Sequence, residues 1–346
     1  MDDTFGMVRD MVARLLADRA TASGTMAAET RGIDSALWSA FDELGLRGDT
    51  AEIGLEGQMA VLQELGSAAA LVPYAESEVL GRWLAKAAGI ETGSDTLAVI
   101  ASDQPIVAGG VLRLSGQAIP WARHADRVLV LVSDGKGVWV AQVTPSKLQL
   151  EHGVNMTGEP LDVVYADSVA ISPDRLHAVP EGVDARALMR LGALCRCASM
   201  LGALHRANEI GLQYSQDRKQ FGKSLSQFQV IQSYLAEMSA EVCAVSIALD
   251  VAIEGAAEGC WGDVAVAKIR AGQAARIVTR LTHQIHGAIG ATQEYPLHLW
   301  TRRLWAWRDE YGSETQWADE LGRSLVASGG DKFWPRMTDD MLALEN

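Results

Sequence analysis

The stretch YSQDRKQFGK, residues 214–223, joins two long segments whose apolar residues recur at helical spacing. An arginine at a helix end, here Arg218, can present two parallel N–H donors to a phosphate group, and Phe221 can flank a ring. A solvated helix–helix connection would explain the stretch equally well by itself. A second stretch, QIHGAIG at residues 284–290, ends a third helical segment. Its glycines either let a ligand phosphate approach backbone N–H groups or simply end the helix.

Long helices surround these two stretches. Apolar periodicity predicts helices over 185–214, 226–255 and 264–286, and Asp263 is expected to cap the third. Short loops between long helices favour an antiparallel bundle, here over residues 181–346.

The preceding region, residues 94–180, has the texture of a β domain. Short runs of alternating or β-branched residues are separated by turn residues, which indicates an antiparallel sheet or barrel. The clearest runs are 97–100, 111–114, 127–132 and 138–140.

Residues 1–93 are expected to be helical. Met7, Met11 and Leu15 recur at a spacing of four, which predicts one apolar helix face. Asp34 is placed to cap a helix that ends at Gly45.

Composition limits the function classes. The chain has 346 residues, is 48% hydrophobic and carries a formal net charge of −14. This charge argues against a nucleic-acid partner, because phosphate backbones are bound by clustered Lys and Arg. We find no uninterrupted apolar run long enough to span a membrane and no leader at the N-terminus, so a cytoplasmic protein is expected.

Cysteine and histidine spacing points to no metal or redox chemistry. Without a CxxC pair, all four cysteines are interpreted as small core residues in a reducing compartment. His283 and His286 are three residues apart, but no third ligand joins them, so no metal site is expected. The cysteines are Cys195, Cys197, Cys243 and Cys260.

Taken together, the order of helical, β and helical regions and the two motifs resemble the acyl-CoA dehydrogenases. These contain RxQFG between bundle helices and QxHGGxG after the third helix. Supporting matches lie at 41–46, 114–117 and 125–128. The resemblance covers nearly the whole chain. It implies an N-terminal α-helical domain (1–93), a middle antiparallel β-barrel domain (94–180) and a C-terminal four-helix-bundle domain (181–346).

The same resemblance implies a flavin cofactor. In this family the two motifs reach the adenosine pyrophosphate of an FAD that is bound in a neighbouring subunit. Ala288 stands where the family usually has a second glycine. The residues that the resemblance assigns to FAD are Arg218, Phe221, Gln229, Gln284 and the backbone of His286, Gly287 and Ala288.

The match fails at the catalytic base. Family members remove the α-proton of an acyl-CoA with a glutamate while a hydride passes to the flavin, because a carboxylate in a dry cleft accepts such a proton well. Tyr311 stands at the commoner glutamate position and Gly192 at the rarer one. Two further family segments are absent. Residues 99–105 stand in place of the TEPxxGSD segment, which lines the flavin and acyl group, and residues 120–123 stand in place of the WIT segment, which faces the flavin ring.

The family elements that contact a neighbour's FAD are retained in this chain. Those that would hold a flavin ring and substrate in its own site are not. The chain therefore resembles the shorter, base-less subunit of actinobacterial α2β2 acyl-CoA dehydrogenases that act on steroid side-chain CoA thioesters. A homologous partner carrying the glutamate, an acyl-CoA substrate and electron-transfer flavoprotein are the implied partners.

Two alternatives remain open at this stage. In one, a homomeric flavoenzyme uses Glu310 or Asp309 as a relocated base, although Glu310 is more simply a solvated charge. In the other, the chain is a flavin-free scaffold. The aromatic residues Trp300, Trp305 and Trp307, with Tyr311, either stack on a ring system or pack against bundle helices.

Overall fold

The computed structural model describes residues 4–19, 21–51, 53–102, 110–133 and 137–331. The chain folds into two compact units. The helical unit contains residues 1–24, 54–70 and 193–346, and the mixed unit contains residues 25–53 and 71–192. The three-domain boundaries after residues 93 and 180 remain a prediction.

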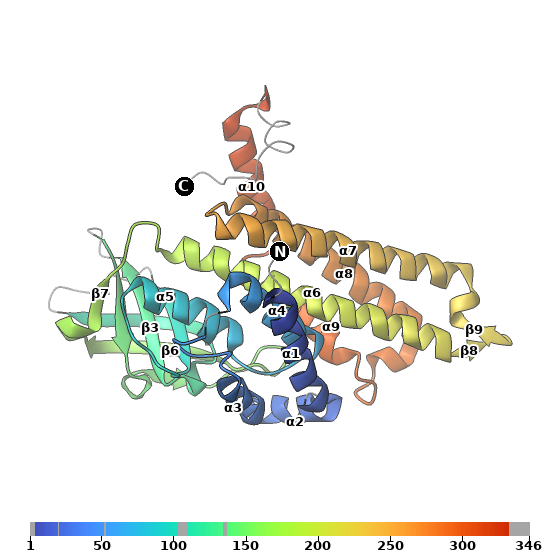
Figure 1. Ribbon diagram of the computed structural model, residues 1–346, viewed down its shortest axis with the longest axis horizontal. Coiled ribbons are helices and arrows are strands. Elements are labelled where there is room, and N and C mark those ends of the chain that lie inside the picture. Colours follow the sequence, from blue (N-terminus) through green and yellow to red (C-terminus); the bar gives the residue numbers. More distant parts are fainter. Residues whose placement is uncertain (1–3, 20, 52, 103–109, 134–136, 332–346) are drawn as a thin grey trace. The chain divides into compact units, whose positions relative to one another are not determined.

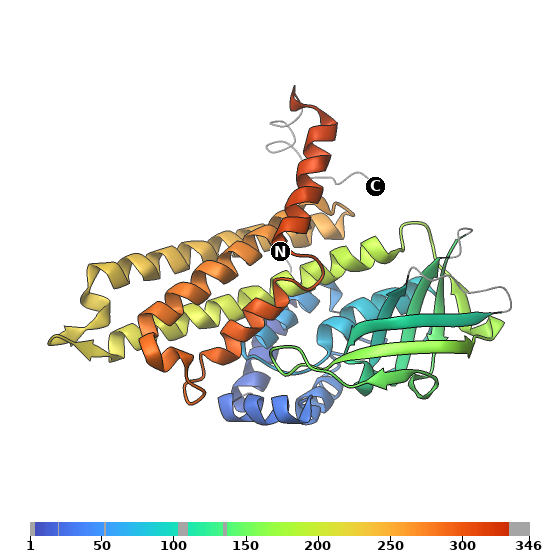
Figure 2. The ribbon, with the colours of Figure 1, turned by 180° about the vertical axis from the view of Figure 1, so that it is seen from behind.

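Long helices dominate the helical unit, where α7 and α8 pack along each other (Figures 1 and 2). The longest, α6 (Ala185–Asp217), begins in the mixed unit and continues into this one. Its other helices are α1 (Thr4–Arg19), α4 (Gly54–Ser67), α7 (Gln229–Ala257), α8 (Gly262–His286), α9 (His298–Trp307) and α10 (Glu314–Ser328).

The three predicted long helices are confirmed with ends that shift by up to three residues. The predicted cap of the third helix is wrong. Trp261 occupies the N-cap position of α8 without a side-chain cap, and Asp263 lies in the first turn, where a carboxylate still favours the positive end of the helix dipole.

A glycine determines how closely α4 and α6 approach. A Cβ atom on Gly202 would lie 1.8 Å from the carbonyl oxygen of Gln63. Only a residue without a side chain therefore allows this backbone contact.

The apolar face of α1 differs from the predicted one. Val8, Val12 and Leu16 are buried, whereas Met7 is 58% exposed. Both sets recur at a spacing of four, so adjacent stripes of the helix were available. Packing of α1 against α4 selects the stripe that begins at Val8.

The described residues of the mixed unit form two sheets. Their hydrogen-bonded orders are β1-β3-β4-β7 and β2-β6-β5. The strands are β1 (Leu97–Ser102), β2 (Val111–Pro120), β3 (Arg127–Ser133), β4 (Val138–Val143), β5 (Gln149–Glu151), β6 (Leu161–Ala170) and β7 (Leu176–Ala178).

The two sheets share one apolar core. Ile100, Val130 and Ala141 from the first sheet and Leu112 and Val164 from the second belong to a single buried cluster. The predicted strands are all confirmed. Among the described strands of this unit, the antiparallel prediction is correct for each pair except β1 and β3, which run parallel from Leu97 opposite Arg127.

Helices of the mixed unit precede the sheets. As predicted, Asp34 caps α3, since its side chain accepts a hydrogen bond from the N–H of Leu37 at 3.1 Å. Gly45, with a φ of +66°, follows its end. The elements are α2 (Ala22–Arg31), which begins at the edge of the helical unit, α3 (Ser35–Glu43), the π-helix η1 (Tyr74–Gly81) and α5 (Arg82–Ala87).

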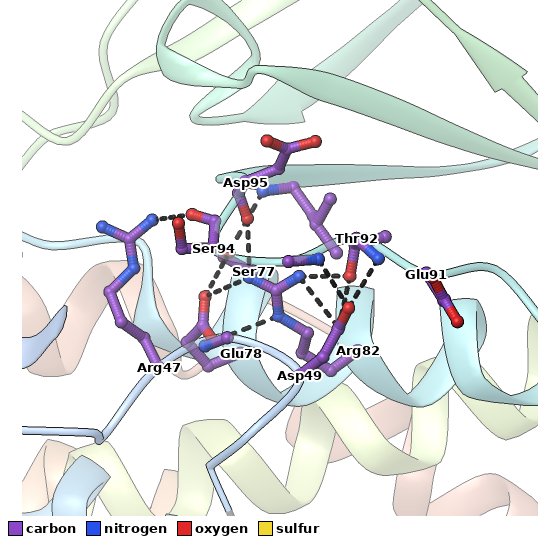
Figure 3. Close-up of polar contacts among 12 residues, drawn as sticks. Arg47, Asp49, Ser77, Glu78, Arg82, Glu91, Thr92, Ser94 and Asp95 are labelled. Carbon is purple, nitrogen blue, oxygen red and sulfur yellow. Dashed lines mark hydrogen bonds and ion pairs between the residues drawn. The ribbon is translucent and has the colours of Figure 1, made fainter.

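Arg82, whose side chain is 11% exposed, links η1 to the loops around it (Figure 3). The Nε of Arg82 donates to Glu78 at 3.2 Å, and an Nη donates to the carbonyl of Asp95 at 2.6 Å. Asp49 accepts N–H bonds from Thr92 and Gly93 at 2.6 and 2.5 Å. This network satisfies a carboxylate, Glu78, that is only 2% exposed.

In the part of the chain that the structure describes, one helix has the length and hydropathy of a membrane span. An 18-residue window of α6 has a mean hydropathy of 1.4, but 94% of it is buried inside the structure. This burial is typical of a core helix.

Candidate functional site

A tight hairpin connects α6 to α7 and presents the first motif. Strands β8 (Lys219–Gln220) and β9 (Lys223–Ser224) are joined by Phe221 and Gly222, whose φ values are +50° and +81°. Positive φ at both central residues is the geometry of a type I′ turn. Phe221 is unusual there, because it has a side chain and is 92% exposed.

Arg218 is fixed at the base of this hairpin by its backbone. Its N–H donates to the carbonyl of Tyr214 at 2.9 Å, and its carbonyl accepts from the N–H of Leu225 at 2.9 Å. The residue is exposed. Within the described ranges, no hydrogen bond or ion pair engages its guanidinium, so its fork of donors faces solvent.

The N-terminus of α7 lies directly after the hairpin. Phe228 occupies the N-cap position and supplies no side-chain cap, and Gln229, the first residue of the helix, is exposed. The N–H groups of the first turn are therefore not capped by a side chain, and they lie at the positive end of the helix dipole.

The second motif ends α8. Gln284, Gly287 and Ala288 are exposed, whereas His286 is only 4% exposed. Gly287 has φ +63° and ψ −142°, and a Cβ built there would meet nothing within 4 Å. Glycine is therefore required by the backbone conformation, which leads into the 3₁₀ turn η6 (Gly287–Ala291).

Side-chain contacts bring the two motifs together at one end of the helical unit. The rings of Tyr214 and His286 stack with centroids 4.2 Å apart. Nδ1 of His286 lies 2.7 Å from the carbonyl oxygen of Thr282, and Nε2 lies 3.1 Å from the hydroxyl of Tyr295. Sequence reasoning missed Tyr214 and Tyr295 as members of this cluster, because the contacts depend on how α6 and α8 pack.

The position that the resemblance assigns to the commoner base holds a phenol. Tyr311 lies between α9 and α10 with a φ of +52°, and its carbonyl accepts a hydrogen bond from Nε1 of Trp317 at 3.0 Å. The guanidinium of Arg196 lies 5.6 Å from the Tyr311 ring centroid. The rarer base position, Gly192, is buried inside α6.

The neighbouring carboxylate has a structural partner. Glu310 Oε2 accepts a hydrogen bond from Nε of Arg196 at 2.6 Å, and their side chains are 25% and 7% exposed. The interpretation of Glu310 as a solvated charge is therefore wrong, because burial of Arg196 requires a compensating anion.

A buried lysine holds the same loop. Nζ of Lys268 donates to the carbonyl oxygens of Trp307 and Arg308 at 3.1 and 2.7 Å. Burial lowers the pKa of Lys268 to about 8 and raises the pKa of the nearby Cys197 thiol to about 12. The end of α9 is thus fixed to α8 and α6.

In the mixed unit, residues 120–123 form a structural corner. Trp121 is buried with a φ of +61°, and Nε of Arg123 donates to the fully buried Asp162 at 2.8 Å. Both side chains are committed to this contact. In the segment 99–105, residues 99–102 belong to β1, and residues 103–105 lie outside the described ranges.

The aromatic residues mainly pack, as the second interpretation predicted. Trp300 and Trp307 are buried, and Nε1 of Trp300 donates to the carbonyl of Ser67 at 2.7 Å. Trp305 is 39% exposed and lies beside Arg308.

The structure shows the burial of the four cysteines and the partner of His283. Cys195 and Cys197 are buried, but Cys243 is exposed and Cys260 is half-buried, so the interpretation of all four as core residues is wrong. The exposed face of α7 carries Cys243 because no described element covers it. His283 bonds separately, to Oγ1 of Thr301 at 3.2 Å.

Comparison with known proteins identifies the fold of this chain. Residues 183–314 match the family model described as acyl-CoA dehydrogenase, C-terminal domain. A chain of the ChsE4-ChsE5 complex from Mycobacterium tuberculosis superposes with a TM-score of 0.85 at 22% identity, over 94% of this chain and 98% of that one. This chain has the acyl-CoA dehydrogenase fold. The resemblance inferred from the two motifs is therefore confirmed, and the predicted fold class with it.

Two relatives in sequence and a further solved structure are also similar to this chain. Acyl-CoA dehydrogenase IpdE2 of Mycolicibacterium smegmatis is 26% identical over 316 residues, 88% of this chain and 93% of that protein. Acryloyl-CoA reductase (NADH) of Anaerotignum propionicum is 34% identical over 102 residues, and the match spans only 26% of that protein's length. A chain of the Tcur3481-Tcur3483 steroid ACAD superposes with a TM-score of 0.79 at 24% identity, over 94% of this chain and 98% of that one.

Proposed function

We propose that this chain is the base-less subunit of a heteromeric, flavin-dependent acyl-CoA dehydrogenase. The observation that carries the proposal is the contrast between its two sites. The groups suited to an adenosine pyrophosphate are exposed at one end of the helical unit, whereas both base positions hold residues, Tyr311 and Gly192, that cannot act as a carboxylate base.

The exposed groups fit the polar half of FAD. Arg218 offers an exposed guanidinium, the N-terminus of α7 offers N–H groups without a side-chain cap, and Gly287 keeps the backbone after α8 clear of side-chain atoms. Phe221 and Gln229 lie beside them on the same connection. When bound, FAD would accept the hydride from the substrate.

A partner subunit would supply the glutamate. Tyr311 presents a phenol, whose ordinary pKa near 10 makes its neutral form a poor proton acceptor at neutral pH. Similarity to chains of the ChsE4-ChsE5 complex and of a steroid ACAD supports a heteromeric assembly and a bulky acyl-CoA, such as a steroid side-chain thioester. We infer electron-transfer flavoprotein as the acceptor from the family resemblance.

Co-expression with the product of the adjacent gene tests this proposal. We expect the chain alone to purify without the yellow flavin absorbance and without acyl-CoA dehydrogenase activity, and the complex to purify with both. Robust turnover by the isolated, homogeneous chain would contradict the proposal and favour a relocated base.

Arg218→Ala tests the cofactor contact within the complex. Loss of a charge-assisted phosphate contact typically costs about 1.5–3 kcal/mol, so FAD affinity should fall roughly 10- to 150-fold with little change in acyl-chain preference. Lys219→Ala is the matched control, because it removes an adjacent exposed positive charge from β8. Equal FAD retention in wild type and Arg218→Ala would show that the arginine is only a surface residue.

A further inference from the structure

His286 sits within the proposed FAD-binding segment, yet its side chain is turned inward. The Nδ1 atom lies 2.7 Å from the carbonyl oxygen of Thr282, which can only accept, so Nδ1 carries the hydrogen. In the neutral ring Nε2 is then an acceptor, and the Tyr295 hydroxyl at 3.1 Å is its donor. Both nitrogens of a neutral imidazole are thereby satisfied, and burial, which lowers the pKa of His286, favours that neutral form.

One face of the imidazole connects it to the first motif. Tyr214 stacks on the ring with an interplanar angle of 25°, and Tyr295 meets Tyr214 edge-on at 5.9 Å. The carbonyl of Tyr214 accepts the N–H of Arg218, one helical turn later. Tyr214 therefore links the imidazole to the backbone that carries the arginine.

The other side of His286 connects it to the second motif. Gly287, which begins η6, follows it directly. The turn then folds back, so that a Cβ on Gly290 would lie 2.8 Å from the Cβ of His286. The imidazole thus contacts the first motif while its own backbone enters the second.

We propose that His286 is a positioning residue, whose imidazole holds the Arg218 turn and the Gly287–Ala291 turn at one fixed spacing so that both halves of the FAD site are presented together. This inference rests on the proposed function. It assigns to His286 no contact with the cofactor through its side chain.

Three variants of the full chain, co-expressed with its partner, test this role. His286→Leu removes both hydrogen bonds, and His286→Asn keeps a donor near the position of Nδ1. His283→Asn is the matched control, because His283 lies on the same helix and is bonded to Thr301 instead. The dissociation constant of FAD is measured by flavin fluorescence, and amide exchange is followed over residues 218–225 and 287–291 in each full chain.

We expect His286→Leu to weaken FAD binding by about tenfold or more, the loss expected for two hydrogen bonds, and to speed exchange in both segments. His286→Asn should recover part of the affinity, and His283→Asn should stay within about twofold of wild type. If His286 only stabilised the fold, its replacement would lower FAD affinity by the same factor with or without Arg218. If His286 acts by placing Arg218, the double variant Arg218→Ala/His286→Leu should bind FAD less than about threefold more weakly than Arg218→Ala alone.

The outcomes separate this inference from the proposed function. Unchanged FAD affinity in His286→Leu, with a loss in Arg218→Ala, overturns the positioning role and leaves the proposed function standing. No loss in either variant overturns the proposed function itself. Should His286→Leu fail to fold, Tyr295→Phe removes one hydroxyl only. We then expect FAD affinity to fall roughly 2- to 10-fold, and an affinity equal to that of wild type refutes the inference.

Discussion

Replacing Glu310 by Gln separates the two explanations of this carboxylate. Its oxygen lies 2.6 Å from Nε of Arg196, whose side chain is 7% exposed. Breaking a buried ion pair costs about 3–5 kcal/mol, and breaking an exposed pair costs about 0–1 kcal/mol. Glu310 is 25% exposed and Gln can still accept one hydrogen bond, so we expect a loss of roughly 1–3 kcal/mol in the free energy of unfolding.

The rate of dehydrogenation should respond differently. If a partner subunit supplies the base, kcat of the assembled enzyme with Glu310→Gln should stay within about twofold of wild type. If Glu310 is itself the base, its amide cannot accept the α-proton, and the loss should be on the order of 10²–10⁴-fold. The assay measures kcat with the best available acyl-CoA and an artificial electron acceptor, normalised to bound flavin, beside a thermal melt of the same preparation.

Asp309→Asn is the control for a general effect of charge in this loop, and it also tests the second carboxylate that was considered as a relocated base. Its side chain is 67% exposed, so stability should change by less than about 0.5 kcal/mol and kcat should not change. A hundredfold fall in kcat for Glu310→Gln, absent in the control, would refute the base-less interpretation. It would mean that the base lies one residue before the family position, which Tyr311 occupies.

Three further changes test the packing. Arg82→Met leaves Glu78 buried without its cation and should cost about 3–5 kcal/mol by urea unfolding, whereas an unchanged midpoint would contradict the network in Figure 3. Gly202→Ala forces a methyl group against the carbonyl of Gln63 and should cost about 1–3 kcal/mol or more; wild-type stability would exclude the close α4–α6 approach. Lys268→Met tests a pH dependence of stability. Between the folded pKa of about 8 and the ordinary pKa of 10.5, Lys268 keeps its proton in the unfolded chain but has lost it in the folded chain. The contribution of this side chain to the free energy of unfolding therefore rises with pH in that range. Denaturant titrations at about pH 7.5 and about pH 9.5 should show a wild-type gain that the variant lacks, and parallel changes in both proteins would contradict it.

Local patterns predicted most of the elements, because capping and periodicity act over a few residues. Asp34, the long helices and the strand runs are examples. The face of α1 was mispredicted because Met7 and Val8 begin equally regular stripes, and only contact with α4 distinguishes them. The parallel pairing of β1 with β3 likewise depends on residues thirty positions apart.

The candidate site shows the same division. Exposed residues such as Arg218 and Phe221 were predicted from a contiguous motif. The inward orientation of His286 and the ion pair of Glu310 were not, because their partners Tyr295 and Arg196 are distant in sequence or lie on another helix. Sequence spacing carries no information on such contacts until the helices are packed.

The ion pair between Arg196 and Glu310 also bears on how this chain could evolve. A mutation of Tyr311 to glutamate would place a second carboxylate beside Glu310, while Lys268 and Arg196 still hold the loop in its present shape. Two adjacent carboxylates repel and compete for one buried guanidinium, so the introduced glutamate would not have the surroundings that a catalytic base needs. We therefore expect such a step to require coordinated changes at several positions. Under the proposed function, this ion pair would make it difficult for the chain to gain a base by a single substitution, and the partner's glutamate would remain necessary.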